Sequence, residues 1–288
     1  TVHAAAGTVF FILLTLGAPL FGDSIVRTAA GTLCRIDRER GFLVSNNGGK
    51  SWRERNGGLP EHVVYPFTDS RPEPLTSIGI DPARQSRVAV TTSSSVFISE
   101  DLGNSWREIP VGEPVKESAF FTSVALSPDS RDRILLGTSF NGVYESRDSG
   151  VTWIHLEELS GPLYRGAGFY EEVRSLSFVL DGPASFLLEV GFDGGIFRGN
   201  LETNILEPLP APGLDGNERP LQLLSSREGP VLLTDAGEWT YRVGLGTWTA
   251  ESGGLPFPRK GISEERRERL RAAADKFGIY LKSWNSSG

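Results

Sequence analysis

The sequence predicts an all-β protein, a β-propeller of about five four-stranded blades, with a C-terminal α-helix. Two observations predict this fold class. The 288 residues include 34 Gly and 18 Pro, which is too many for a helical bundle and lacks the triplet period of collagen. An octapeptide that ends in Trp also recurs along the chain, and repeats of about 40 to 50 residues are typical of propellers.

The octapeptide, here called the octad, has the pattern Ser-x-Asp/Asn-x-Gly-x-Ser/Thr-Trp and occurs three times without gaps. The stretch from the third copy to Trp248 is long enough for two further units, so five units are expected. The fixed positions of the three octads are Ser45, Asn47, Gly49 and Trp52; Ser99, Asp101, Gly103 and Trp106; and Ser146, Asp148, Gly150 and Trp153.

The fourth and fifth units have lost most of the octad. Residues 195–198 still match residues 142–145 of the third unit, and Thr247 and Trp248 end the fifth. In the fourth unit the octad positions hold Gly199, Leu201, Thr203 and Leu206.

Each unit is expected to form four short strands, because apolar runs of four to seven residues are separated by turn signals such as Asp-Pro, Ser-Pro and Asn-Gly. Four antiparallel strands are the unit of a propeller blade. The predicted strands are 76–81, 87–92, 96–99 and 104–109 in the second unit, and 121–126, 133–138, 143–146 and 151–156 in the third.

The octad is expected to stabilise the turn between the third and fourth strands of a blade. Its Asp or Asn oxygen can accept backbone N–H bonds, its Gly suits a positive φ, and its Trp can pack between blades. These roles are structural, and no octad carboxylate is expected to be catalytic.

The three octads resemble the Asp box, or bacterial neuraminidase repeat, of sialidases and related propellers. From residue 24 to residue 255 the longer units are similar to the propellers of photosystem II stability-factor-like proteins, sortilin-type receptors and xyloglucanases. The resemblance implies a propeller fold and leaves the function open.

The octads and the candidate ligand residues are expected on opposite rims, because connectors between blades emerge away from the turns that join third and fourth strands. The connector 160–172 combines aromatic rings with charged groups, as sugar sites do. The alternative is a plug over the channel mouth. The candidate ligand-binding residues are Tyr164, Arg165, Phe169, Tyr170, Glu171 and Glu172, with His62 and Tyr65 on an earlier connector.

The sialidase resemblance implies a test of its chemistry. A sialidase would need an arginine triad, a Tyr nucleophile activated by a Glu and an acid/base Asp. The chain has no Arg-Ile-Pro segment before its first octad, and 34–37 is the nearest string. Tyr170 with Glu171 or Glu172 could imitate the nucleophile pair only by coincidence. No catalytic residue is therefore assigned.

Charge and cysteine content exclude several classes of partner. The net charge of −7 and the lack of a continuous basic stripe give no footprint for nucleic acid. The single cysteine, Cys34, is expected to be buried on a strand. No metal site and no cofactor are predicted, since scattered His and Cys residues offer no ligand spacing.

The two ends of the chain lead to further expectations. Residues 8–21 are an uncharged run that suits the apolar core of a secretory signal within 1–22, although a buried first strand is the alternative. The propeller is assigned to 23–257. Within 258–288, a helix is expected at 263–277, followed by a strand. That strand is similar to the opening strand of a glycoside-hydrolase barrel family, or it packs back onto the propeller. The chain has no Met, which is expected of a fragment or a processed form.

Together these patterns predict an exported, extracytoplasmic binding module that recognises a glycan or a protein, as an accessory to a downstream glycoside-hydrolase domain. Contact with a membrane is expected only through the N-terminal segment, and the oligomeric state stays open. The alternatives are a glycosidase of the sialidase type with its site in the propeller mouth, or an assembly factor for a membrane complex.

Overall fold

The structure is a computed structural model that describes residues 25–28, 30–63, 70–112, 115, 120–179, 184–190, 195–210, 220–224, 230–234, 238–242 and 245–250. The predicted signal, the helix expected at 263–277, the strand after it and Tyr65 lie outside the described residues. Within the described residues, no helix is long and apolar enough to cross a membrane.

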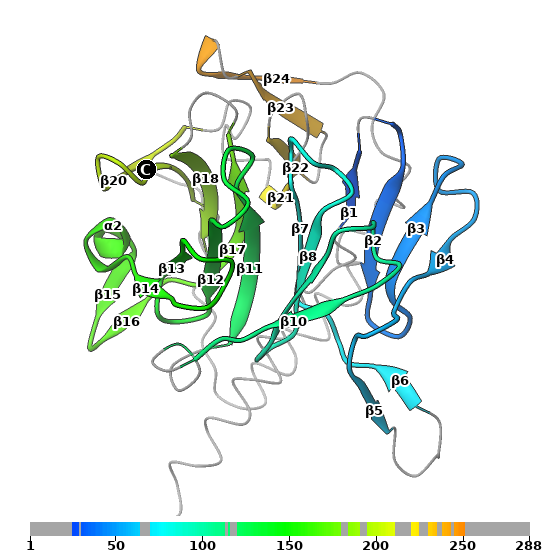
Figure 1. Ribbon diagram of the computed structural model, residues 1–288. Coiled ribbons are helices and arrows are strands. Elements are labelled where there is room, and N and C mark those ends of the chain that lie inside the picture. Colours follow the sequence, from blue (N-terminus) through cyan, green and yellow to red (C-terminus); the bar gives the residue numbers. More distant parts are fainter. Residues whose placement is uncertain are drawn as a thin grey trace, which may run out of the picture.

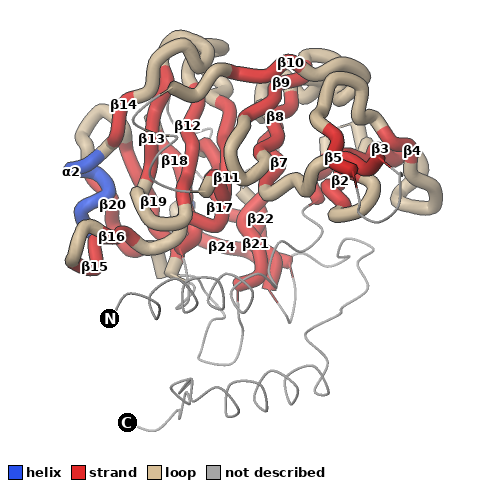
Figure 2. The backbone as a smooth tube through the Cα atoms, turned by 90° about the horizontal axis from the view of Figure 1, so that it is seen from below, coloured by secondary structure: helices blue, strands red, loops and turns tan. Residues whose placement is uncertain are grey.

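The described chain forms five four-stranded antiparallel sheets, as the repeat predicts, and they surround a common centre (Figures 1 and 2). In each sheet the four strands are consecutive in sequence. Blade 1 contains β1 (Ile25–Arg27), β2 (Leu33–Asp37), β3 (Gly41–Ser45) and β4 (Arg53–Glu54); blade 2 contains β7 (Ser77–Ile80), β8 (Val88–Thr91), β9 (Val96–Ser99) and β10 (Arg107–Ile109); blade 3 contains β11 (Phe121–Leu126), β12 (Ile134–Thr138), β13 (Val143–Ser146) and β14 (Ile154–His155); blade 4 contains β17 (Val173–Phe178), β18 (Ser185–Val190), β19 (Ile196–Asn200) and β20 (Ile205–Pro208); blade 5 contains β21 (Pro220–Leu224), β22 (Val231–Thr234), β23 (Glu238–Arg242) and β24 (Thr247–Ala250).

Two hairpins and two short helical turns were not predicted. The hairpin of β5 (Glu61–Val63) and β6 (Ser70–Pro72) follows blade 1. After blade 3 come α2 (Glu157–Ser160), the 3-10 turn η1 (Gly161–Leu163) and the hairpin of β15 (Tyr164–Gly166) and β16 (Phe169–Tyr170). The outer strands are also shorter than expected, since β10 begins at Arg107 and β14 at Ile154.

Four clusters of buried apolar side chains fill the spaces between neighbouring blades. Ile98 and Ile109 of blade 2, for example, pack with Val124 and Leu136 of blade 3. The cluster between blades 1 and 2 also includes Val231 of blade 5, so a side chain of the last blade packs into the core shared by the first two. Cys34 is buried in this cluster, as predicted, and burial raises the pKa of its thiol to about 12.

Hydroxyl groups at the start of the innermost strands connect one blade to the next. Thr76 Oγ1 donates to the carbonyl of Phe121 (2.9 Å), and Thr122 Oγ1 donates to the carbonyl of Val173 (2.7 Å). Ser77 Oγ accepts from the backbone N–H of Val124 (3.2 Å). These bonds satisfy backbone groups that face a neighbouring sheet rather than a ladder partner.

The octads form the turns between the third and fourth strands, and their hydrogen bonds repeat. In the second copy, Ser99 Oγ accepts from the N–H of Gly103 (2.7 Å), and Asp101 accepts from the N–H (2.9 Å) and the hydroxyl (2.7 Å) of Ser105. These bonds from Ser105, followed by the bond from Ser99, lower the pKa of Asp101 to about 2. The octad glycines have φ of 84° (Gly49), 87° (Gly103) and 93° (Gly150), where a side chain is strained.

The octad tryptophans pack at the blade edges. Trp106 is buried and donates its indole N–H to the carbonyl of Arg55 in the preceding segment (2.7 Å), and Trp153 donates in the same way to Pro110 (3.3 Å). Trp52 of blade 1 instead lies beneath the guanidinium of Arg35, 4.8 Å from its ring centre. In the decayed fourth unit, Leu206 takes the buried position.

Candidate functional site

The predicted connector 160–172 begins with a helical turn that anchors it. Leu159 of α2 and Leu163 of η1 are buried between blades 3 and 4. The hairpin β15–β16 follows and lies at the edge of the disc (Figure 1). The segment thus joins a buried anchor to an exposed hairpin.

Five aromatic residues lie together around this hairpin, and we call them the aromatic ridge: Phe120, Phe140, Tyr164, Phe169 and Tyr170. Phe169 is 52% exposed and meets Phe140, 43% exposed, edge to face with ring centres 6.0 Å apart. Tyr164 (47% exposed) meets Tyr170 at 5.3 Å. Phe120 (44% exposed) is held beside them because its carbonyl accepts from the N–H of Ser139 (2.9 Å).

Backbone bonds fix the position of the ridge on blade 3. The N–H of Tyr170 donates to the carbonyl of Phe140 (2.7 Å), and the N–H of Glu171 donates to the carbonyl of Leu163 (2.8 Å). The hairpin is therefore attached to the turn between β12 and β13 on one side and to η1 on the other. Such anchoring holds the exposed rings without a ligand.

A second layer of rings lies beneath the ridge. His155 packs against Tyr170 at 5.5 Å and against Tyr144 at 4.8 Å. Burial raises the pKa of Tyr170 above its usual value, and the negative charge of Glu157 adds to the rise. Tyr170 is therefore held as the neutral phenol at neutral pH.

The predicted charged residues form ion pairs, and the partner of Glu172 is Arg174, which was not predicted. Arg165 Nε donates to Glu171 Oε1 (2.6 Å), and Arg174 Nε lies 3.4 Å from Glu172 Oε2. Arg165 also donates to the carbonyl of Pro162 (3.2 Å). The two arginines beside the ridge are consequently neutralised by neighbouring carboxylates.

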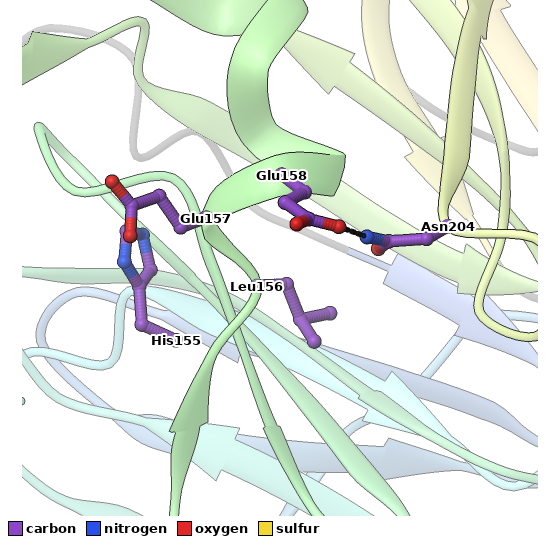
Figure 3. A pocket seen from close by; sticks show the side chains of 5 residues that line it. All are labelled: His155, Leu156, Glu157, Glu158 and Asn204. Carbon is purple, nitrogen blue, oxygen red and sulfur yellow. Dashed lines mark hydrogen bonds between the residues drawn. The ribbon is translucent and has the colours of Figure 1, made fainter.

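A cavity of about 230 Å³ opens beside the second layer, between blade 3 and the turn that joins β19 to β20. We call it the acidic cavity. Figure 3 shows Glu158 pointing towards Asn204, whose Nδ2 donates to Glu158 Oε2 (2.6 Å). The residues that line the acidic cavity are His155, Leu156, Glu157, Glu158 and Asn204.

The other predicted connector does not join this site. His62 lies on β5, where all three residues are exposed, and pairs with Arg71 in the register of the hairpin. Figures 1 and 2 both place β5–β6 on the side of the disc away from β15–β16. The structure therefore brings Tyr164, Arg165, Phe169, Tyr170, Glu171 and Glu172 together and leaves His62 apart.

Several residues of the site were not predicted. Phe120, Phe140, Glu157, Glu158 and Asn204 are not among the candidate ligand-binding residues of the sequence. Among the described residues, no three His, Cys, Asp or Glu side chains gather in a way that could hold a metal ion.

No protein-family model and no curated protein matches the chain. Solved structures do resemble it. A GH74 enzyme from Niastella koreensis is 14% identical with a TM-score of 0.53, over 78% of this chain and 36% of that one. A chain of a nidogen/laminin complex is 9% identical with a TM-score of 0.51, over 80% of this chain and 79% of that one. A structure of YCF48 bound to D1 peptide is 16% identical over 82% of this chain and 86% of that one, with a TM-score of 0.38.

The chain thus spans little more than a third of the GH74 enzyme. At these identities, the likeness to the first two structures shows the propeller fold, which the strand order shows independently. The likeness to the GH74 enzyme agrees with the predicted propeller fold and shows the fold alone.

Proposed function

We propose that this chain is an extracytoplasmic, non-catalytic binding module that recognises a glycan through the aromatic ridge. The observation that carries the proposal is the exposure of Phe140, Phe169 and Tyr164 in two ring pairs on one hairpin and the turn that holds it, with the exposed Phe120 bonded through its backbone to Ser139. Large apolar rings gathered on a surface mark an interaction site, since water solvates them poorly. Ring faces next to carboxylates suit pyranose rings, which have apolar faces and polar edges.

In this proposal the octads are Asp boxes that stabilise the propeller. Asp101 and Asp148 each bond to the Ser or Thr four residues later, at 2.7 and 2.5 Å, so their oxygens are used within the turn. The order of antiparallel strands assigns the octads to the rim opposite the ridge. The ridge rim is then left for the ligand.

Export through residues 1–22 and an accessory role towards a downstream glycoside-hydrolase domain are part of the same proposal. Secretion of the full-length product, followed by fractionation of the cells, tests the first. The complete reading frame tests the second: paired carboxylates in a barrel beyond residue 288 would support it, and a different domain there would contradict it.

The ridge is tested with a glycan array and the variant Phe169→Ala. Loss of the ring is expected to weaken glycan binding at least roughly tenfold, about 1.4 kcal/mol, with an unchanged melting temperature. Val151→Ala, on an exposed apolar residue of the third octad, is the control and is expected to bind normally. Glycan binding that survives Phe169→Ala would contradict the proposal. Capture of a membrane protein in place of glycans would favour the assembly-factor alternative.

The arrangement around Tyr170 gives little support to a sialidase. A Tyr nucleophile must lose its proton, whereas burial and Glu157 raise the pKa of Tyr170. Glu171 is engaged by Arg165, and Glu172 lies next to Arg174. The binding proposal expects no hydrolysis of a fluorogenic sialoside; hydrolysis that Tyr170→Phe abolishes would overturn it.

A further inference from the structure

The charge around the aromatic ridge is unbalanced. Arg165 and Arg174 are each paired with a carboxylate, whereas Glu157 and Glu158 form no ion pair among the described residues. Both of these carboxylates line the acidic cavity. A ligand that reaches from the ridge into the cavity therefore meets uncompensated negative charge.

The acidic cavity adjoins the aromatic ridge at one side chain, His155. His155 is a wall of the cavity and also packs against Tyr170, which in turn packs against Tyr164. His155 Nε2 is buried and has no hydrogen-bond partner among the described residues. A polar group of a ligand could therefore form a hydrogen bond with this nitrogen. A single extended ligand can contact both places.

Two separate physical effects favour a cationic group on this surface. Carboxylates attract it directly, and the faces of aromatic rings attract it through their quadrupole. An anionic sugar is disfavoured by both effects, and the neighbouring arginines are already occupied by carboxylates.

We propose that the ridge binds a chain of amino sugars, with protonated amines directed at the acidic cavity and pyranose faces stacked on the rings. This inference rests on the proposed glycan-binding function. A basic peptide would offer similar charge, but peptides commonly add main-chain hydrogen bonds to an open strand. Here the N–H groups of Tyr170 and Glu171 are already bonded within the protein, which favours a sugar.

The experiment compares two hexasaccharides that differ only at nitrogen, one of glucosamine and one of N-acetylglucosamine, by calorimetry below the pKa of the sugar amine. The glucosamine chain is expected to bind roughly tenfold more tightly, because it gains charge and cation–π interactions. Glu157→Gln and Glu158→Gln are each expected to remove several-fold of this preference. Glu158→Gln retains an oxygen that can accept from Asn204 Nδ2.

Asp129→Asn is the matched control, because it removes one exposed charge on the octad rim of the same blade. An equal loss in this variant would mean that the chain's overall charge attracts the oligomer, and would overturn the inference. Equal affinity for both hexasaccharides, each abolished by Phe169→Ala, would overturn the inference while the proposed function stands. If Glu157→Gln weakens binding and Phe169→Ala does not, the acidic cavity binds the amines but the rings of the ridge do not take part, which contradicts the stacking part of the inference. Tighter binding of hexalysine than of the glucosamine chain would identify a peptide ligand and also overturn the inference.

Discussion

Gly150 of the third octad lies against Ile109 of blade 2, so closely that a Cβ on this glycine would overlap Ile109 Cγ2. The glycine of the second octad has the same relationship to Phe42 of blade 1, where a Cβ would come within 2.5 Å of Cε1. The octad glycine therefore serves two purposes: it adopts the positive φ of the turn, and it lets the neighbouring blade approach.

Gly150→Ala is expected to destabilise the propeller by about 3 kcal/mol, because backbone strain and overpacking each cost roughly 1 to 3 kcal/mol. Gly48→Ala is the control, since Gly48 also has a positive φ but a Cβ there would have no atom within 4 Å. For Gly48→Ala the free energy of unfolding is expected to fall by only about 1 kcal/mol. Urea denaturation measures both, and equal losses would show that packing against Ile109 is unimportant.

Asp101→Asn is expected to reduce the acid sensitivity of the fold. The native pKa of about 2 lies below the ordinary 3.8, so the ionised carboxylate stabilises the folded state above the ordinary value. This contribution is lost as the pH falls from about 4 towards 2. The first octad has Asn47 in this position, where its Oδ1 accepts from the N–H of Ser51 (3.0 Å) and its Nδ2 donates to Ser51 Oγ (2.8 Å). An amide therefore fits.

Melting temperatures measured across the acid range test this prediction, with Asp101→Ala as the variant that loses the turn bonds at every pH. Asp101→Ala is expected to be destabilised by about 1 kcal/mol at neutral pH. An unchanged acid transition in Asp101→Asn would show that other carboxylates determine it.

Ser77→Ala is expected to destabilise the fold by about 1 to 2 kcal/mol, because the backbone N–H of Val124 loses its acceptor in a dry interface. Chemical denaturation provides the measurement, with the exposed Ser94→Ala as the control. Equal stability of the two variants would mean that the hydroxyl contacts between innermost strands contribute nothing.

Glu189→Gln is expected to stabilise the protein at neutral pH by about 2 kcal/mol. Glu189 is fully buried on β18, and burial raises the pKa of its carboxyl. A raised pKa means that the folded state prefers the protonated acid, so stability is lost as the pH rises through the ordinary carboxyl value towards the native one. Gln removes this loss and keeps a group that can bond with Ser175 Oγ, which lies 3.0 Å from Glu189 Oε2.

Denaturation curves at acid and neutral pH measure the free energy of unfolding of Glu189→Gln and of the original protein. The gain from Glu189→Gln is expected to shrink as the pH falls. A destabilised Gln variant at neutral pH would show instead that the ionised carboxylate has a stabilising partner.

The sequence predicted the inner parts of the blades better than their edges. The predicted bounds of β9, β11 and β13 are those of the structure, because buried strands in this chain are continuous apolar runs between turn residues. The fourth strands were predicted too long: Ser105 gives its N–H to Asp101 in the turn and makes no ladder bond with it. Helix α2 has only four residues, too few to show a helical period.

The candidate site was predicted where it is local in sequence. Tyr164 and Tyr170 meet because a hairpin joins them, and the aromatic composition of that segment was visible. Asn204 reaches Glu158 across the boundary between two blades, and no pattern in a single sequence indicates that pairing. Phe120 stands next to the buried Phe121, and nothing in the sequence tells which of these two rings is exposed.

Within the described residues, every blade takes its four strands from one uninterrupted stretch of chain, and Val231 of blade 5 packs into the cluster of blades 1 and 2 without any exchange of strands. Duplication or deletion of a whole unit in the gene would therefore leave the strand order of every other sheet unchanged. After such a duplication or deletion, complementary packing would have to form again only at the interfaces between the altered unit and its two neighbouring blades. Blades 4 and 5 each keep four paired strands although their units lack most of the octad.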